Sequence, residues 1–175
     1  MTASMPSEWH DFYVLLGTAS AALVALLFVA VSVGASLISP DRSTATRTFM
    51  SPVVFHYSSI LLLSLIALIP DLTPAALAFA IALLAVFGMA YTTVVMVGLA
   101  RASISDAADR LGYGLLPLAA YLGMLAAAGL AFVETPLSAD IVAGSLLLLL
   151  AVNIRNAWDL LLAFARRIAS QSPGS

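Results

Sequence analysis

The chain has 175 residues, of which 62% are hydrophobic and 9% are charged, with a formal net charge of −2 and a mean hydropathy of +1.08. Soluble domains carry about 25% charged residues, so this chain has too few polar side chains to cover a soluble fold, and its composition is that of a membrane protein. The absence of a basic run excludes a nucleic-acid partner, and the absence of cysteine excludes disulfides and thiolate metal sites.

Five segments are long and apolar enough to cross a bilayer as helices, because about 20 apolar residues span its hydrocarbon core. They cover approximately residues 12–38, 49–69, 75–100, 114–133 and 141–162. The breaks between them contain Pro40, Pro70, Pro74 and Pro136 beside polar residues, which is typical of turns. The loops are short. We therefore expect an all-α polytopic membrane protein with a single transmembrane domain over residues 1–169 and a disordered tail at 170–175.

The distribution of charge predicts the orientation of these five spans. Cytoplasmic loops are enriched in Arg and Lys, and five crossings place alternate loops on opposite sides. The first side then carries Glu8, Asp11, Asp71, Glu134 and Asp140 and no arginine, whereas the second side carries Arg42, Arg47, Arg101, Arg110, Arg166 and Arg167. The N-terminus is therefore expected outside the cell and the C-terminus in the cytoplasm.

The seventh arginine lies within the fifth span, in the stretch NIRNAWD at residues 153–159. With the predicted orientation, Arg155 lies roughly 5–8 Å below the cytoplasmic membrane surface, at 1.5 Å per helical residue. Arg155 and Asp159 share one helix face, in the less favourable order for an i,i+4 pair. Two interpretations remain open. The pair can anchor the helix at the interface by snorkelling, or it can belong to a polar site on a path for a solute or protons.

Other polar side chains are expected at a similar depth. His56 and Ser59 lie one to two turns from the cytoplasmic end of the second span, and Thr92 lies about two turns from that end of the third. Such a common level is typical of a cytoplasm-facing polar vestibule and equally of an interhelical hydrogen-bond network. The candidate set for either arrangement is His56, Ser59, Thr92, Asn153, Arg155, Asn156 and Asp159.

Small residues in the first span predict a helix-packing face. Gly17, Ala21 and Ala25 follow one another at intervals of four residues, a small-xxx-small pattern that lets two helices approach closely. Packing within the chain and packing between copies both fit this pattern.

The chain is not expected to be an enzyme. The triplet Gly34-Ala35-Ser36 matches the GxS of intramembrane serine proteases, but a serine nucleophile needs a base within hydrogen-bonding reach, and no histidine is near it in sequence. Walker, HExxH and dinucleotide-binding motifs are absent. Because its two histidines lie far apart and on opposite predicted sides, neither a haem nor a metal site is supported, and no cofactor is expected.

The first span reads WHDFYVLLGTASAALVALLFVAVSVGAS, and the last contains NAWDLL. These two stretches resemble the first and last helices of a group of small bacterial multi-pass proteins, whose first helix reads roughly W-x2-F-F/Y followed by a Gly/Ala-rich stretch and GLLFVAVS. Some members are labelled "modulator of FtsH protease", although the seven-span modulators of that protease differ from this chain in span number. The resemblance implies a bacterial inner-membrane location.

Two functions follow as hypotheses. The first is an oligomeric channel or transporter-like protein with a polar level near the cytoplasmic side, since small channels often form their pore at a symmetry axis. The second is a non-catalytic modulator or scaffold of another membrane protein, for example a membrane protease. The expected partners are the lipid bilayer, further copies of the chain and, for the second hypothesis, another membrane protein.

Overall fold

A computed structural model describes residues 7–34, 43–102, 107–131 and 137–171, and its regular elements in these ranges are all helical. They are α1 (Ser7–Gly34), α2 (Ser43–Ala67), α3 (Pro74–Ala102), α4 (Ala107–Arg110), the π-helix η3 (Leu111–Leu115), α5 (Leu116–Ala131) and α6 (Leu137–Gln171). The predicted all-α class is therefore confirmed.

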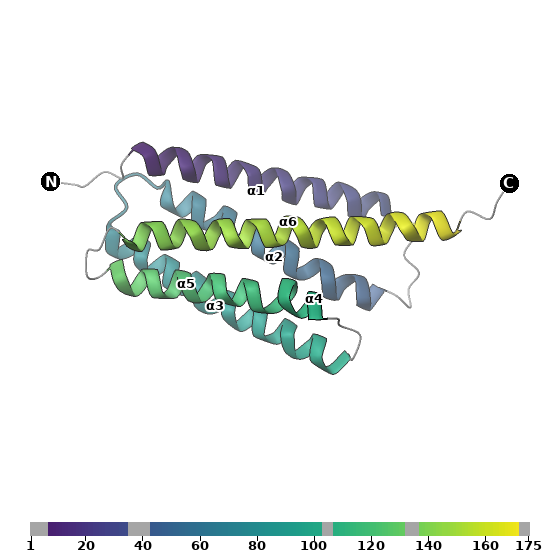
Figure 1. The fold of residues 1–175 in the computed structure, drawn as a ribbon. Helices are drawn as coiled ribbons and strands as arrows, with labels where there is room; N and C mark the ends of the chain where they lie inside the picture. The colour runs from purple at the N-terminus through teal and green to yellow at the C-terminus, as the bar shows by residue number, and fades with distance from the viewer. Residues whose placement is uncertain (1–6, 35–42, 103–106, 132–136, 172–175) are drawn as a thin grey trace.

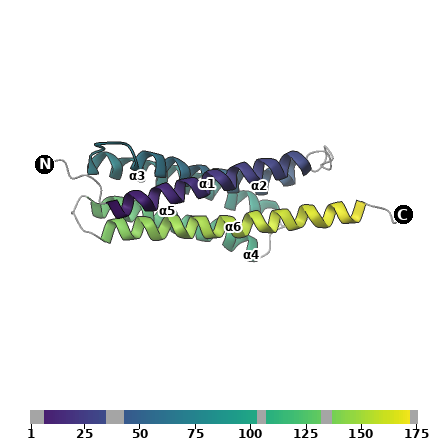
Figure 2. The ribbon, with the colours of Figure 1, turned by 90° about the horizontal axis from the view of Figure 1, so that it is seen from above.

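Four helices form a bundle, and α1 lies against its outside. In ring order the bundle is α2, α3, α5 and α6, each packed against the next, and α6 closes the ring against α2. α1 packs mainly against α2 and makes a smaller contact with α6. The start of α1 and the end of α6 lie at opposite ends of the bundle in both views (Figures 1 and 2).

Four helical stretches are long and apolar enough to cross a membrane. They are Trp9–Ala30, Pro74–Arg101, Ala108–Ala131 and Leu137–Leu162, with mean hydropathies of 1.7 to 2.3. In α2 the described apolar part, Ser51–Ala67, is shorter. The chain is thus a helical membrane protein.

The helices extend beyond the apolar segments that the sequence delimits. α1 begins at Ser7 and α2 at Ser43, before the expected starts at residues 12 and 49. The helix that contains the fourth span begins at Ala107 rather than 114, and α6 continues to Gln171. Ser170 and Gln171 therefore belong to a helix rather than to the expected tail, while residues 35–38, 132–133 and 172–175 lie outside the described residues. A helix satisfies its own backbone whether or not its surface is apolar, so apolar length alone underestimates helix length.

The turn between α2 and α3 is built by local side-chain chemistry. Asp71 adopts a left-handed backbone conformation with φ 55°, which aspartate tolerates better than most residues. Thr73 caps α3, because its hydroxyl oxygen accepts a hydrogen bond from the backbone N–H of Ala76 at 3.2 Å. Pro74 occupies the first helical position, where its missing N–H costs nothing.

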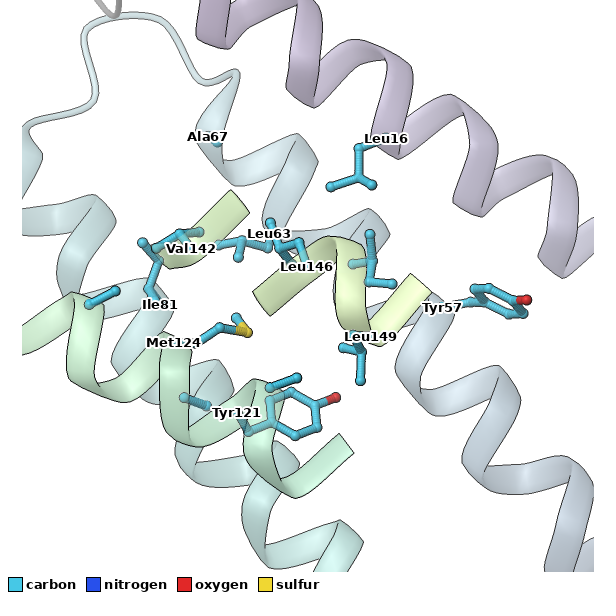
Figure 3. Close-up of a cluster of buried hydrophobic side chains, with 14 of the residues drawn as sticks. Leu16, Tyr57, Leu63, Ala67, Ile81, Tyr121, Met124, Val142, Leu146 and Leu149 are labelled. Atoms are coloured by element: carbon cyan, nitrogen blue, oxygen red, sulfur yellow. The ribbon is translucent and has the colours of Figure 1, made fainter. Parts of the chain in front are cut away.

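The core of the bundle is largely aliphatic in the half where α1 begins. Figure 3 shows Leu63, Leu146 and Met124 converging from α2, α6 and α5, and each of them is fully buried. Leu16 of α1 adds to the same cluster from outside the ring. Polar side chains enter this core nearer the middle and the opposite end of the bundle, where they form the candidate site.

Candidate functional site

The polar stretch of α6 divides between the inside and the outside of the bundle. Asn153 and Asn156 are buried, with exposed fractions of 0% and 1%. They continue a buried stripe that runs through Val142, Ser145, Leu146, Leu149 and Val152 at the spacing of one helix face. Arg155 and Asp159 lie on another face of α6, and about half of each side chain is exposed.

Among the residues that the structure describes, Arg155 forms its ion pair with Asp159 on the same helix. Arg155 Nη2 lies 3.6 Å from Asp159 Oδ2. Trp158 next to them is 61% exposed. An outward-facing ion pair beside an exposed tryptophan fits the anchoring interpretation, because tryptophan and snorkelled arginine are both typical of the membrane interface.

The centre of the site is a buried pair between α2 and α5. His56 Nδ1 lies 2.9 Å from the Tyr121 hydroxyl oxygen, and the two residues are 1% and 0% exposed. Ser59, one turn along α2 from His56, is also buried, and its hydroxyl donates to the Phe55 carbonyl oxygen at 2.9 Å. The Phe55 and Tyr91 rings stack beside this pair, with centroids 4.0 Å apart, and tie α2 to α3.

The two ring nitrogens of His56 have different surroundings. Nδ1 shares a hydrogen bond with the Tyr121 hydroxyl, and the direction of that bond depends on the imidazole tautomer. Nε2 lies in the bundle interior, where it has no hydrogen-bond partner among the described residues.

A second polar contact lies at the π-helix η3, which directly precedes α5 in the chain. The Asn156 side-chain amide donates to the Gly112 carbonyl oxygen at 2.9 Å, and the Tyr113 hydroxyl donates to the Asn156 backbone carbonyl at 3.3 Å. Gly112 permits this approach, because a β-carbon there would lie 2.8 Å from both Arg155 Nη1 and Asn156 Oδ1. Single π-turns are rare and frequently occur at functional sites.

Close approaches between antiparallel helices give the relative heights of these groups. On α3 and α5, Gly88 faces the Tyr121 ring, and Met96 faces Gly114. Thr92, which is fully buried, lies midway between Gly88 and Met96 and therefore at a height between Tyr121 and Gly114. On α6, Asn153 precedes Asn156 by one turn, and Asn156 faces Gly112. Buried polar groups thus follow one another from His56 to Asn156.

These heights correct the expectation of one common polar level. Tyr121 of α5 lies nine positions after Gly112 of η3, which is roughly 13 Å along a helix. His56 is therefore well separated in depth from Asn156 and from Arg155 beside it. Gly88 stands fourteen positions from each end of α3, so the His56–Tyr121 pair lies near the middle of the bundle. Counting from residue 49 puts His56 too close to the cytoplasmic end of the second span, whereas α2 begins at Ser43 and has more helix on that side of His56.

Four side-chain atoms along this series have no hydrogen-bond partner in the part of the chain that the structure describes. They are His56 Nε2, Thr92 Oγ1, Asn153 Oδ1 and Asn156 Oδ1. Asn153 satisfies only its donor, through the Leu149 carbonyl oxygen at 2.6 Å. Because an unpaired buried polar atom costs about 1–3 kcal/mol, four in one series need an explanation beyond packing. We refer to His56, Thr92, Asn153 and Asn156 as the polar column.

Of the three small residues in the predicted packing face of α1, one packs against another helix of the chain. Gly17 is buried against α2, where a β-carbon would lie 3.1 Å from Ser64 Cβ. Ala21 and Ala25 are exposed, so packing within the chain does not use them. α1 instead turns Leu16, Ser20 and Leu27 inward, which gives the interface larger side chains than the alanines would.

Several residues of the site were outside the expected set. Tyr121 and Tyr113 are aromatic, and aromatic residues in apolar spans are most often core, so nothing in the sequence singled them out. Gly88 and Gly112 matter only because of what faces them. Once the register of two antiparallel helices is known, a glycine at the same height as a tyrosine on the neighbouring helix indicates a close contact between them.

No three or more His, Asp or Glu side chains come together as a metal site within the described ranges. Comparison with known proteins adds no relative: no family model matches the chain, and neither a curated protein nor a solved structure is significantly similar to it.

Proposed function

We propose that the chain is a transporter-like protein of the bacterial inner membrane, with five spans, an external N-terminus and a cytoplasmic C-terminus. In this proposal, protons or a small hydrogen-bonding solute pass through the interior of each protomer along the polar column. The observation that carries it is the set of four unpaired polar atoms on helices that pack in a membrane. Polar groups inside a membrane bundle are expensive to bury and mark solute or proton pathways.

The column supports protons or neutral solutes rather than large ions. Its side chains are an imidazole, a hydroxyl and two amides. Arg155 and Asp159 are half-exposed and lie outside it, with the Arg155 guanidinium beside Asn156 at one end of the column. His56 supplies the titratable group, and its Nε2 atom has no partner among the described residues. In the tautomer that leaves the lone pair on Nε2, this atom can take up a proton while Nδ1 stays bonded to Tyr121.

The position of the polar column favours a path through each protomer over a pore at an oligomer axis. A pore at an oligomer axis needs its polar residues on the outer surface of each copy, whereas these residues are buried within one protomer. The proposed path therefore runs through the protomer. Association of copies is retained as a proposal, and the outward face of α1, with Leu15, Leu26 and Phe28 exposed, is the surface it would use.

Cysteine accessibility tests the path directly, because the native chain contains no cysteine. Thr92→Cys and Asn153→Cys report on the column, and Ala120→Cys reports on a residue that is equally buried but not in the polar series. In inside-out vesicles, a small water-soluble thiosulfonate reagent should modify positions 92 and 153 and spare position 120. If the two column positions are as unreactive as position 120 in folded protein, the column is a closed hydrogen-bond network.

Flux is the second readout. Reconstituted protein should carry protons into liposomes under a potassium diffusion potential, recorded with an entrapped pH-sensitive dye. His56→Ala should abolish this flux, while Ala151→Leu on the exposed face of α6 should leave it unchanged. Flux that persists in a folded His56→Ala variant would contradict the role of the column in proton movement.

The second candidate is a modulator or scaffold of another membrane protein. The half-exposed Arg155–Asp159 pair and exposed Trp158 favour it, since they present polar and aromatic groups on the surface of α6. It predicts no flux, and a co-purifying membrane protein that is lost in Arg155→Leu. The same variant is neutral for flux if the chain is a transporter and the pair is an anchor.

A further inference from the structure

Two adjoining cavities lie at the end of the bundle where α1 begins, far from the polar column. The larger, of about 390 Å³, is apolar and is lined by residues from α1, α3, α5 and α6, among them Tyr13, Ile81 and Val142. The smaller, of about 310 Å³, lies at the α2–α3 turn and is lined by His10 and Asp71. Leu77 belongs to the walls of both.

Trp9 and His10 place the boundary between the two cavities on the first turns of α1. Trp9 lines the apolar cavity, and its neighbour His10 lines the smaller one. The apolar walls come from the first two or three turns of α1, α3 and α6 and from the end of α5, so this cavity opens near one membrane surface. A tryptophan at this position is typical of the headgroup region.

The charged side chains described at this end of the bundle are acidic. Asp71 lines the smaller cavity. Asp11 and Asp140 are exposed on the first turns of α1 and α6. The described segments at this end, residues 7–11, 68–74 and 137–140, contain no arginine or lysine.

We infer that the two cavities together bind one phospholipid with an amine headgroup, phosphatidylethanolamine, from the leaflet at this end. The acyl chain occupies the apolar cavity, because an apolar space next to lipid is filled by hydrocarbon rather than by water. The headgroup ammonium lies at Asp71, where a carboxylate favours a cation. An anionic headgroup such as phosphatidylglycerol finds only like charge there. This site does not depend on the transport proposal.

Native mass spectrometry of delipidated protein tests the site. The protein is titrated with phosphatidylethanolamine, phosphatidylglycerol and phosphatidylcholine of identical chains. We expect one tightly retained phosphatidylethanolamine per protomer, and affinity about fivefold weaker for phosphatidylglycerol, the factor that a partly exposed charge contact provides. Equal retention of all three lipids by the wild-type protein would overturn the assignment of the headgroup.

Variants separate the two halves of the site. Ala139→Leu fills the apolar cavity from a half-buried wall position and should reduce retention of all three lipids at least fivefold. Ala151→Leu, exposed on the same helix, is its control. Asp71→Asn keeps a residue that tolerates the left-handed backbone, and it should remove the preference for phosphatidylethanolamine while keeping retention of the chain.

The result that would overturn the cavity assignment is undiminished lipid retention in Ala139→Leu. If that variant does not fold, as judged by its thermal unfolding, Ala131→Leu on α5 lines the same cavity and gives the same test. A preference for phosphatidylethanolamine that survives Asp71→Asn would show that the headgroup is recognised elsewhere.

Discussion

The ring of Tyr121 lies so close against Gly88 that a β-carbon at position 88 would overlap it. Gly88 therefore sets where the Tyr121 ring can lie, and the ring in turn holds the hydroxyl that contacts His56 at 2.9 Å. The centre of the polar column thus depends on a glycine in α3 that carries no functional group. This relationship gives the sharpest test of the site geometry.

Gly88→Ala should destabilise the protein by about 1–3 kcal/mol, the usual cost of overpacking a filled core. Gly98→Ala on the same helix is the matched control, because nothing lies within 4 Å of the added β-carbon there. It should be neutral or slightly stabilising, since alanine is the better helix former. Thermal unfolding in detergent measures both variants.

Removal of the ring should relieve the overlap. Tyr121→Leu should cost less stability in the Gly88→Ala background than in the wild-type chain, a non-additivity expected of residues in contact. Additive effects would contradict the contact between the Tyr121 ring and Gly88.

The His56–Tyr121 hydrogen bond should be visible as a coupling energy. Tyr121→Phe removes the hydroxyl while keeping the ring on Gly88, and His56→Ala removes the other partner. A double-mutant cycle should give about 0.6 kcal/mol and at most about 1.7 kcal/mol, the average and the maximum measured for hydrogen bonds between membrane helices. The cycle is measured by unfolding in mixed detergent, and Tyr121→Phe with Thr93→Ala, an exposed residue that bonds its own helix, supplies an uncoupled control pair.

Much of the fold follows from the sequence because a membrane constrains it. Backbone groups in lipid must be satisfied within each segment, so apolar length predicts helices, and the all-α class is confirmed. Residue-level packing does not follow in the same way. In a helix that is apolar on all sides, such as α3, nothing in the sequence distinguishes the face towards the core from the face towards lipid, so the contact between Gly88 and Tyr121 could not be predicted.

The candidate site was predictable where polarity contrasts with its surroundings. His56, Ser59, Thr92, Asn153 and Asn156 stand out in apolar spans, and the structure buries all five. Their depths were less predictable, because helix ends depend on caps and turns such as Thr73 and not on hydropathy. The outward direction of Arg155 and Asp159 follows from helical spacing once Asn153 and Asn156 are known to face inward.

The two halves of NIRNAWD should respond differently to substitution. Arg155→Leu combined with Asp159→Leu should leave unfolding nearly unchanged, because exposed ion pairs contribute little. Asn156→Leu should destabilise by about 1–3 kcal/mol, since it removes the donor to the Gly112 carbonyl and leaves that acceptor unpaired. Thermal unfolding of both variants at equal detergent concentration makes the comparison. A larger loss in the charged double variant would assign Arg155 or Asp159 a structural role that the 3.6 Å pair does not suggest.

The fifth span rests on α2, and cysteine labelling can test it. α2 has 25 residues, which at 1.5 Å per residue is roughly 37 Å and exceeds the hydrocarbon thickness of about 30 Å. Its middle is buried within the ring of helices, with Val53, Ile60 and Leu63 fully covered. We therefore predict that Ser39→Cys and Leu72→Cys, placed before and after α2, lie on opposite sides of the membrane.

A membrane-impermeant maleimide applied to intact spheroplasts should label Leu72→Cys and leave Ser39→Cys unlabelled until the membrane is opened. Ser138→Cys at the start of α6 should behave like Leu72→Cys, and Ala108→Cys in α4 like Ser39→Cys. Labelling of positions 39 and 72 from the same side would mean that α2 does not cross. The arginines of the loops would then no longer all lie on one side of the membrane. Opposite labelling with positions 39 and 108 outside would keep five spans and reverse their direction, because the positive-inside tendency is statistical and sets no absolute rule for one protein.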